Sequence, residues 1–320
     1  MTTYKCSIIA NPEGNAWNFA QEVYKRLRAR NEKYELNKVL IQKFRDGEIK
    51  PKIEKNVRRR NCFFIHDSSL NPNDWFLQLA LINETLKNSS AQEITDVLPY
   101  LKFGRQDRKD ESRVPISSKV IAKLVERDAN RVLTMDVHNP SIGGFYDIPF
   151  DNLYSFLNVV DYLKKNYSYV LENAVIMSPD VGGAKRARSF AKRANIRKIV
   201  VGDKNREEDG EVESIQIIGD VKGKNVLMVD DIIDSGNTLI QACDACKKQG
   251  AEKVYAYATH GLFTTGTEKL TGCFDLIIVG DTFPNPNLMD NKIKVVSFAD
   301  LFAEAIYRIN EGESLSALFD

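Results

Sequence analysis

Residues 226–238 read VLMVDDIIDSGNT, in which an apolar run delivers two adjacent aspartates into a loop of small and polar residues. The run predicts a buried strand, and the helical pattern from Leu239 onward predicts a helix directly after the loop. Gly236 lets the backbone approach a ligand closely, and N–H groups at a helix N-terminus favour an anion. The carboxylates of Asp230 and Asp231 suit sugar hydroxyls or a Mg²⁺ ion. The stretch therefore indicates a site for a phosphorylated sugar; the simpler alternative is a strand that ends in an Asp-capped turn.

The same alternation of strand, loop and helix runs through the whole chain. Short apolar or β-branched runs alternate with amphipathic stretches, a pattern typical of parallel sheets covered by helices. Helices are predicted over Lys185–Ala194 and Leu239–Lys248, among others. The predicted strands are Cys6–Ala10, Lys38–Gln42, Cys62–His66, Ile94–Leu98, Arg131–Val137, Ala174–Met177, Lys198–Val201, Asn225–Val229, Lys253–Ala258, Asp275–Val279 and Ile293–Ser297. We therefore predict an α/β fold of two similar domains, each a mainly parallel sheet flanked by helices.

The length of 320 residues exceeds the usual span of one hydrophobic core. A loop marked by Gly and Pro leads into a new helix near Asp151–Ser155, which places the boundary there. We predict one α/β domain over residues 1–152 and a second over 153–298. The last segment, 299–320, begins with a predicted helix, Ala299–Ile309, which we expect to pack back on the first domain.

Charge and composition restrict the classes of partner. Lys and Arg total 45 against 44 Asp and Glu, a net charge of +1. This balance argues against a general electrostatic attraction to nucleic acid or to an anionic membrane. No apolar run approaches the roughly 18 residues that span a bilayer, and the first residues lack the pattern of a signal peptide. We expect a cytoplasmic protein that acts on small molecules.

The five cysteines, an odd number spread over a long chain, argue against a disulfide framework. Cys243 and Cys246 have the CxxC spacing of redox and zinc pairs. However, they fall with Leu239 and Ala242 at positions i, i+3, i+4 and i+7 of a predicted helix, a stripe that faces a core. We interpret the pair as core residues, because no second ligand pair exists elsewhere.

Two clusters of polar residues follow strands of the predicted first domain. Residues 105–110 concentrate guanidinium groups and carboxylates beyond the Ile94–Leu98 strand, at the edge where parallel sheets bind ligands. Asp136 and His138 point to the same side at the end of another strand, and Asp147 and Asp151 follow in the next loop, so the set could hold Mg²⁺. The alternatives are a solvated charge run and a structural histidine.

Two further stretches lie in the predicted second domain. Residues 178–184 place Asp180 and two glycines between a strand and a helix, as in a second phosphate or metal contact, or in a glycine turn without a ligand. Residues 204–211 are highly charged and follow a strand directly. We interpret them as a mobile loop, which by itself would be an ordinary solvated turn.

Taken together, these stretches closely resemble the ribose-phosphate pyrophosphokinases, also called phosphoribosyl pyrophosphate synthetases. The motifs occur in the family order across nearly the whole chain. They are residues 44–48, 105–110, 135–140, 144–153, 178–180, 218–221, 226–238, 257–261 and 312–316. The resemblance implies domains of the type I phosphoribosyltransferase-like fold, with ATP bound on the side of the first domain.

The resemblance also implies the reaction and the cofactor. The β,γ-diphosphoryl group of ATP would pass to the 1-hydroxyl of ribose 5-phosphate, with release of AMP. Mg²⁺ would act as Mg-ATP together with a second ion. Lys204 and Arg206 match the pair that the family closes over the transferring group, where positioning and charge stabilisation achieve most of the catalysis.

Site residues follow from the matching positions. The ATP-binding residues implied are Phe44, which would lie against adenine, and Asp46, Gly47, Glu48, Arg105, Gln106 and Asp107. The ribose 5-phosphate residues implied are Arg206, Asp230, Asp231, Asp234, Ser235, Gly236, Asn237 and Thr238. His138 and Asp180 would serve the metal–ATP complex, and Asp136, Asp147 and Asp151 are further candidates for the metal.

The chain departs from the family pattern in its catalytic and phosphate loops. Asn205 stands where many relatives carry Arg, and Ser235-Gly236-Asn237 stands where they carry Thr-Ala-Gly or Thr-Gly-Gly. Ser235 keeps a hydroxyl, and Asn237 tolerates a left-handed backbone. These changes affect the expected affinity more than the expected activity.

Regulation and assembly are also implied by the resemblance. Inorganic phosphate is a candidate activator, and the family's hexamer, built from dimers, is the expected homo-oligomer. The residues that fall where effector contacts occur in the family are Asn56, which replaces a usual Ser, and Arg58, Arg113, Ser314 and Ser316.

Two other functions remain as alternatives. A phosphoribosyltransferase shares the phosphate-loop motif, but residues 44–48 and 105–110 have no purpose in an enzyme that binds no ATP. A non-catalytic regulatory subunit of the synthetase would be expected to have lost or enlarged the catalytic loop. Here Lys204, Arg206, His138 and Asp180 are all present and the loop is short.

Overall fold

The computed structural model describes residues 5–206, 212–285 and 288–319. The chain divides into two compact units. The first contains Met1–Tyr154, Thr282–Pro286 and Phe298–Asp320, and the second contains Ser155–Asp281 and Asn287–Ser297. No helix in the described ranges is long and apolar enough to cross a membrane.

The first unit is built on a seven-stranded sheet of order β3-β2-β1-β4-β5-β6-β7. All neighbours are parallel except β2 and β3, which form an antiparallel hairpin at one edge. The strands are β1 (Cys6–Ala10), β2 (Tyr34–Lys43), β3 (Ile49–Ile53), β4 (Asn61–Ile65), β5 (Glu93–Leu98), β6 (Arg131–Met135) and β7 (Phe150–Leu153).

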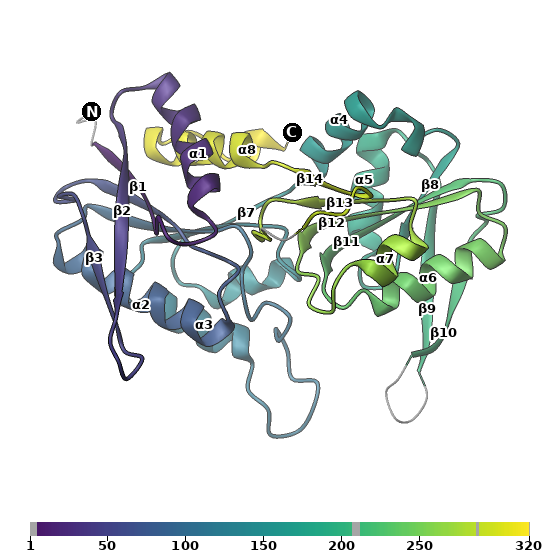
Figure 1. Cartoon of the computed structure of the whole chain (residues 1–320), viewed down its shortest axis with the longest axis horizontal. Helices are drawn as coiled ribbons and strands as arrows, with labels where there is room; N and C mark the ends of the chain where they lie inside the picture. Colours follow the sequence, from purple (N-terminus) through teal and green to yellow (C-terminus); the bar gives the residue numbers. More distant parts are fainter. Residues whose placement is uncertain (1–4, 207–211, 286–287, 320) are drawn as a thin grey trace. The chain divides into compact units, whose positions relative to one another are not determined.

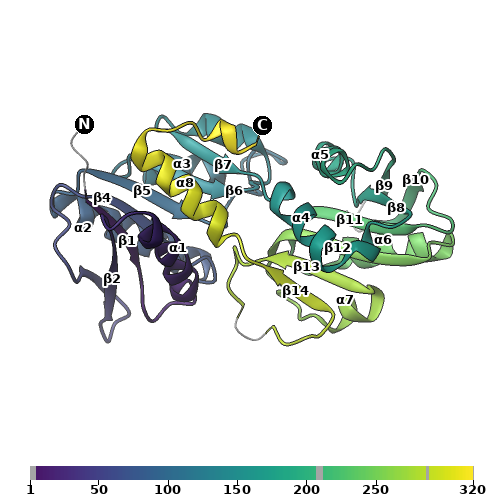
Figure 2. The same cartoon turned by 90° about the horizontal axis from the view of Figure 1, so that it is seen from above.

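Helices cover both faces of this sheet. On one face lie α2 (Pro72–Asn88) and α3 (Ser117–Val125), and on the other lie α1 (Trp17–Arg30) and the C-terminal α8 (Ala299–Glu311), as Figures 1 and 2 show. Two short 3₁₀ helices, η1 (Pro140–Phe145) and η3 (Ser316–Leu318), complete the unit. The main core cluster joins the apolar stripes of α2 and α3 to the strands.

The C-terminal helix α8 packs beside α1, nearly three hundred residues away in the sequence. The rings of Phe19 and Phe302 meet edge to face at 5.4 Å. Arg26 pairs with Asp300 and Arg30 pairs with Glu304 along the exposed side of the same contact. Residues of α8 thus belong to the core of the first unit.

The second unit is built on a sheet of order β10-β9-β8-β11-β12-β13-β14. It too is parallel except for one edge hairpin, β9–β10. The strands are β8 (Ala174–Ser178), β9 (Ile199–Arg206), β10 (Val212–Ile218), β11 (Asn225–Ile233), β12 (Lys253–Gly261), β13 (Leu276–Gly280) and β14 (Ile293–Val296). The helices are α4 (Phe156–Asn166), η2 (Ser168–Val170), α5 (Ala184–Ala194), α6 (Asn237–Lys248) and α7 (Glu268–Cys273).

The core of the second unit contains the predicted helical stripe. Leu239, Ala242, Cys243 and Cys246 of α6 are buried together with α7 against the strands, whereas α4 and α5 lie on the opposite face (Figure 1). The prediction that the CxxC stripe faces a core is therefore confirmed.

The two sheets have the same topology, because adding seven to each strand number of the first sheet reproduces the second. The predicted fold, two similar α/β domains with mainly parallel sheets, is confirmed. In each sheet the strand order reverses once, between β1 and β4 and between β8 and β11. Ligands of open α/β sheets bind outside the carboxyl ends of the strands at this reversal.

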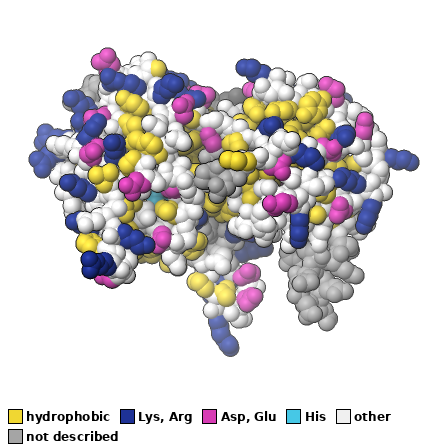
Figure 3. All heavy atoms as spheres, in the orientation of Figure 1, with side chains coloured by type: hydrophobic (Ala, Val, Ile, Leu, Met, Phe, Trp, Pro, Cys, Tyr) yellow, Lys and Arg dark blue, Asp and Glu magenta, His cyan; other side chains and the backbone are white. Residues whose placement is uncertain are grey.

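Charged side chains of both signs are intermingled on the face drawn in Figure 3. Blue Lys and Arg side chains alternate there with magenta Asp and Glu side chains. This distribution agrees with the nearly equal numbers of the two kinds of charge in the sequence.

Candidate active site

The phosphate loop, residues 234–238, joins β11 to α6 at the strand reversal of the second sheet. Gly236 precedes the helix with φ +76°, and a Cβ there would lie 2.7 Å from the side chain of Leu270. Only glycine fits this conformation and this space. Within the described residues no side chain caps the start of α6 and no acidic residue lies in its first turn. The positive end of the helix is therefore suited to an anion.

A second segment, residues 262–265, holds the phosphate loop in place. Leu262 N–H donates to the carbonyl oxygen of Ile233 at 2.8 Å. The hydroxyl of Thr264 donates to Asp234 Oδ1 at 2.5 Å, and the hydroxyl of Thr265 donates to the carbonyl oxygen of Ser235 at 3.2 Å. These contacts order the loop, and the sequence patterns did not identify them.

Asp230 and Asp231 share one guanidinium group. Arg186 Nη1, from α5, lies 3.2 Å from a carboxylate oxygen of each residue. Burial, followed by the neighbouring carboxylate of Asp231, raises the pKa of Asp230, and Arg186 opposes this shift. Sequence reasoning missed Arg186. The available signal was the pair of adjacent acids at the end of a strand, because two neighbouring carboxylates favour a nearby cation.

Asp180 follows β8, the strand next to β11, so it reaches the same carboxyl edge as Asp230. The Ser178 hydroxyl donates to the carbonyl oxygen of Asp180 at 2.6 Å, and Gly183 N–H donates to Asp180 Oδ1 at 3.0 Å. A Cβ on Gly183 would lie 2.6 Å from Ser178 Oγ, so the turn needs a glycine there. The structure thus brings this turn and the phosphate loop to one sheet edge.

Lys204 and Arg206 lie further along the sheet, in the β9–β10 hairpin. Their backbones pair with Ile215 and Val212 of β10. The expectation of a loop over the whole of 204–211 needs correction, because β9 continues through Arg206. The side chains of Lys204 and Arg206, and residues 207–211 altogether, lie outside the described part of the chain.

In the first unit, the β2–β3 turn displays Phe44. Phe44 and Glu48 close the turn through a backbone hydrogen bond of 2.8 Å, and Gly47 adopts φ +97°. Glu48 N–H donates to Asp46 Oδ1 at 3.1 Å. The Phe44 ring is 43% exposed, and Lys50 Nζ lies 5.8 Å from its centre. An exposed ring on an ordered turn can stack on a flat ligand.

Two other predicted groups meet beyond β5 and β6. Asn139 Nδ2 donates to Asp107 Oδ2 at 2.6 Å, which places Asp107 beside the segment that carries the exposed His138. The Ser117 hydroxyl donates to the side chain of Gln106. Arg105 is exposed in the same segment. Residues 105–107 and 138–139 therefore form one polar surface.

The acids proposed around His138 are not gathered at one point. Asp136, buried with φ +39°, follows β6, whereas Asp151 lies within β7 opposite Leu133. Asp147 pairs with Lys123 at 2.6 Å, and Asp151 pairs with Arg131 at 2.5 Å. Across the described residues, no group of three or more His, Cys, Asp or Glu side chains is arranged to hold a metal ion.

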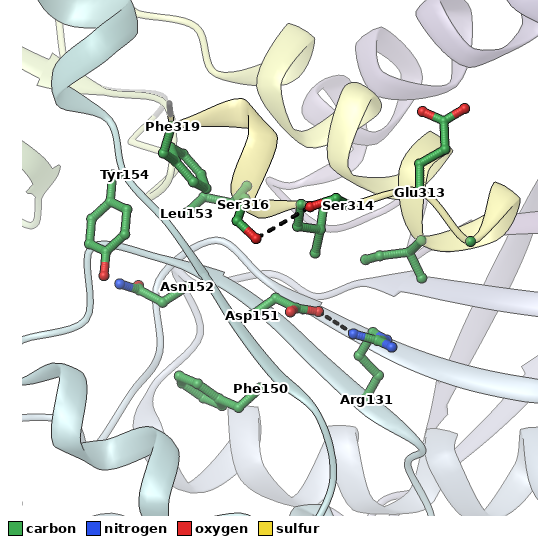
Figure 4. A pocket seen from close by; sticks show the side chains of 13 residues that line it. Arg131, Phe150, Asp151, Asn152, Leu153, Tyr154, Glu313, Ser314, Ser316 and Phe319 are labelled. Carbon is green, nitrogen blue, oxygen red and sulfur yellow. Dashed lines mark hydrogen bonds and ion pairs between the residues drawn. The ribbon is translucent and has the colours of Figure 1, made fainter.

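A pocket of about 590 Å³ lies between β7 and the C-terminal segment of the first unit (Figure 4). Arg131 and Asp151 form one side, and Ser314 and Ser316, whose hydroxyls are 3.3 Å apart, form the other. Phe319 also lines the pocket. The other candidate effector residues are not in this lining: Asn56 accepts from Arg58 N–H at 2.9 Å, and Arg113 has φ +65°.

Comparison with known proteins places the chain in a family. Residues 12–128 match the N-terminal domain of ribose phosphate pyrophosphokinase, and residues 209–320 match the phosphoribosyl synthetase-associated domain. The chain is 42% identical over 290 residues to a ribose-phosphate pyrophosphokinase of Rhizobium meliloti, covering 89% of this chain and 93% of the relative. For that of Chlorobaculum tepidum the identity is 44% over 280 residues, covering 87% and 85%.

A solved structure is also similar. The phosphoribosylpyrophosphate synthetase from Mycobacterium smegmatis superimposes with a TM-score of 0.86 and 29% identity, covering 96% of this chain and all of that one. The similarity thus extends over both units. This chain belongs to the ribose-phosphate pyrophosphokinase family.

Proposed function

We propose that this protein transfers the β,γ-diphosphoryl group of ATP to the 1-hydroxyl of ribose 5-phosphate, for nucleotide biosynthesis. The products are 5-phosphoribosyl 1-pyrophosphate and AMP. In this reaction O1 of the sugar bonds to the β-phosphorus, the bond from that phosphorus to the α-phosphate oxygen breaks, and the hydroxyl proton is released. The observation that carries the proposal is the phosphate loop itself, in which two acids precede an uncapped helix start in a family member.

The second unit would bind the sugar phosphate. Residues 234–238 present hydroxyl and backbone N–H donors to the 5-phosphate, while Asp230 and Asp231 accept hydrogen bonds from ribose hydroxyls. Arg186 lies 3.2 Å from an oxygen of each carboxylate and so holds the two side chains in place. Thr264 fixes Asp234, so the loop is ordered before the ligand arrives.

The first unit would bind ATP. Phe44 offers an exposed ring for the adenine base, and Asp46 and Glu48 lie on the same turn. Arg105 and Gln106, on the surface that Asp107 shares with Asn139, offer donors to the phosphates. These positions support the ATP side of the reaction and have no role in a phosphoribosyltransferase.

The donor set fits Mg²⁺ bound together with phosphate oxygens. Mg²⁺ usually keeps waters and takes one or two carboxylates plus substrate phosphates, so a cage of protein acids is not required. In the second unit the candidate to hold an ion is Asp180; in the first unit it is His138, acting through water, and Asp136 is a further candidate there. When bound, the ion supplies charge neutralisation to the phosphates. Asp147 and Asp151 are already paired with cations and are weaker candidates.

Lys204 and Arg206 would stabilise the charge that develops on the transferring group. Two cations on a hairpin provide this stabilisation without a covalent intermediate. Exclusion of water would also matter, because hydrolysis of ATP is the competing reaction.

The test is phosphorus NMR of the protein with Mg²⁺ and ATP, in the presence and absence of ribose 5-phosphate. Stoichiometric AMP and a new diphosphate ester, formed only with the sugar, are expected. Consumption of 5-phosphoribosyl 1-pyrophosphate with a nucleobase would show a phosphoribosyltransferase instead. Intact ATP binding without turnover would show a non-catalytic subunit.

The pocket beside Ser314 and Ser316 is a candidate effector site in a cytoplasmic homo-oligomer. The hydroxyls of Ser314 and Ser316 suit an anion such as inorganic phosphate, which would compete with Asp151 for Arg131. Asn56, Arg58 and Arg113 do not line this pocket, so in this proposal they would join it from other subunits of a homo-oligomer, such as a hexamer built from dimers. Turnover measured with and without added phosphate, and light scattering of the native protein, test the two parts separately.

A further inference from the structure

Two thiols from different helices meet where α6 and α7 pack together. The Cys243 sulfur, on α6, lies 3.4 Å from the carbonyl oxygen of Cys273, the last residue of α7. The Cys273 sulfur lies 3.9 Å from the carbonyl oxygen of Ile240, one turn before Cys243. Each sulfur thus faces the opposite helix at the level of the other cysteine. Cys246 points elsewhere and contacts the sulfur of Met177 at 3.4 Å.

The surroundings make the two thiols chemically unequal. Cys243 is fully buried, whereas Cys273 keeps 9% of its surface exposed. The hydrogen bond with Cys243, aided by the ammonium group of Lys247, lowers the pKa of Cys273. Asp244 Oδ1, 3.5 Å from the Cys273 sulfur, opposes this shift. The same hydrogen bond and burial raise the pKa of Cys243. A thiol with a lowered pKa and some remaining exposure, next to a fully buried thiol, is typical of redox-sensitive pairs.

We propose that Cys243 and Cys273 form a reversible disulfide in the presence of hydrogen peroxide, and that this bond weakens the binding of ribose 5-phosphate. The first part concerns only the thiols. The second part rests on the function proposed above, because it assigns ribose 5-phosphate to the phosphate loop.

The oxidation would proceed in two steps. The Cys273 thiolate attacks one peroxide oxygen, the O–O bond breaks, and the sulfur becomes a sulfenic acid while the departing hydroxide takes up a proton to give water. The Cys243 sulfur then attacks that sulfur and releases its hydroxyl, which leaves as a second water with the Cys243 thiol proton. The two thiols lose two electrons in total, and one peroxide becomes two waters. A thiol reductant reverses the reaction.

The α7 helix connects this pair to the phosphate loop. Leu270 lies one turn before Cys273 and already fills the space that a Cβ on Gly236 would need, at 2.7 Å. The preceding segment bonds Asp234 through Thr264. A sulfur–sulfur bond of about 2 Å is shorter than any non-bonded contact between two thiols, so its formation draws α7 toward α6. Leu270 is then pressed against Gly236, and the loop is displaced from its phosphate-binding geometry.

The chain provides an internal comparison in Cys6 and Cys62. These residues lie on the neighbouring strands β1 and β4 and are also buried. Burial raises the pKa of each to about 12. Because the thiolate is the reactive form, this pair should resist peroxide under conditions that oxidise Cys243 and Cys273.

The first experiment treats the whole protein with hydrogen peroxide and counts free thiols, followed by peptide mapping without reduction. We expect the loss of two thiols, recovered with dithiothreitol, and a cross-link between the peptides of α6 and α7. Cys243→Ala and Cys273→Ser should each abolish the cross-link, whereas Cys246→Ala, which leaves one cysteine on α6, should retain it. No loss of thiols, or a cross-link that survives Cys273→Ser, would overturn the proposal.

The second experiment measures ribose 5-phosphate binding by calorimetry on reduced and oxidised protein. We expect binding weakened about fivefold or more on oxidation, in the range of ordinary coupling between sites, and no change for Cys273→Ser. Equal binding in both states would overturn the coupling and leave the disulfide established. Failure of the reduced protein to bind ribose 5-phosphate would instead contradict the proposed function. The disulfide would still be tested in that case, because thiol counting needs no substrate.

Discussion

Asp96 is a carboxylic acid enclosed in the first unit. It is fully buried on β5 and accepts a hydrogen bond of 2.8 Å from Asn83 Nδ2. Oδ1 of Asp96 and Oδ1 of Asn83 have no hydrogen-bond partner in the described structure. Burial raises the pKa of Asp96 to about 8, so the group is protonated at neutral pH.

Asp96→Asn should therefore stabilise the first unit in a pH-dependent way. From about pH 4 to about pH 8 the unfolded chain releases the Asp96 proton while the folded chain keeps it, so the free energy of unfolding of the wild type falls as the pH rises. The free energy of unfolding of the Asn variant does not fall in this way, because the Asn side chain has no proton to release in this range. The advantage of the Asn variant in free energy of unfolding should grow across that window to on the order of 5 kcal/mol at pH 8.

Urea unfolding followed by tryptophan fluorescence measures this difference, because Trp17 and Trp75 both lie in the first unit. The exposed Asp110→Asn is the matched control for loss of a charge. A stability difference for Asp96→Asn that stays constant from pH 5 to pH 8 would contradict the neutral state of Asp96.

Gly236 is the residue on which the shape of the phosphate loop depends. Gly236→Ala adds strain at φ +76° and a methyl group 2.7 Å from Leu270. We expect a loss of about 1 kcal/mol or more in stability and weaker binding of ribose 5-phosphate. Calorimetric titration measures the binding. Gly272→Ala, where a Cβ meets nothing within 4 Å, is the matched control and should bind normally.

At the scale of the element, we expect Lys204 of the β9–β10 hairpin to act in catalysis more than in the binding of ribose 5-phosphate. Lys204→Ala should lower turnover by about 10²-fold or more, as removal of a group that stabilises developing charge usually does. The affinity for ribose 5-phosphate should change little, because the phosphate loop lies on β11 and α6. Steady-state kinetics resolve the two effects, with the exposed Lys192→Ala of α5 as control. Near-normal turnover of Lys204→Ala would mean that the hairpin does not act in catalysis.

The elements also show where sequence patterns were sufficient. Each strand predicted from an apolar run overlaps an observed strand, because such runs must be buried on both faces of a parallel sheet. The edge strands β3, β7 and β10 were missed. In β3, the residues Ile49-Lys50-Pro51-Lys52-Ile53 mix Lys and Pro, which edge strands tolerate and central strands do not. The strand predicted over Arg131–Val137 ends at Met135, where Asp136 turns to φ +39°.

At the scale of the whole molecule, the first unit is completed only by the C-terminal segment. Phe302 of α8 is fully buried, whereas the ion pair between Arg26 and Asp300 lies at the surface. Phe302→Ala should lower the free energy of unfolding of this unit by about 3–5 kcal/mol, and Asp300→Asn by about 1 kcal/mol at most. Trp17 fluorescence in urea reports both. Similar losses for the two variants would contradict the dominance of the apolar contact.

The sequence by itself determined the units that are local in the chain. Residues 226–238 and 178–184 specify a strand, a loop and a helix start within a few positions, because backbone conformation, glycine placement and helix N-termini are short-range properties. For the same reason the family motifs, which are contiguous, could be recognised without a structure.

Only the tertiary structure decided which distant side chains meet. Arg186 reaches Asp230 and Asp231 from α5, and Cys273 reaches Cys243 from α7. Parallel strands are joined through helices, so residues at one sheet edge come from segments tens of positions apart. Whether two such side chains touch depends on strand order and helix packing, which no local spacing encodes. Asp147 and Asp151 show the same dependence. The sequence made them candidates for a metal, whereas the structure pairs them with Lys123 and Arg131.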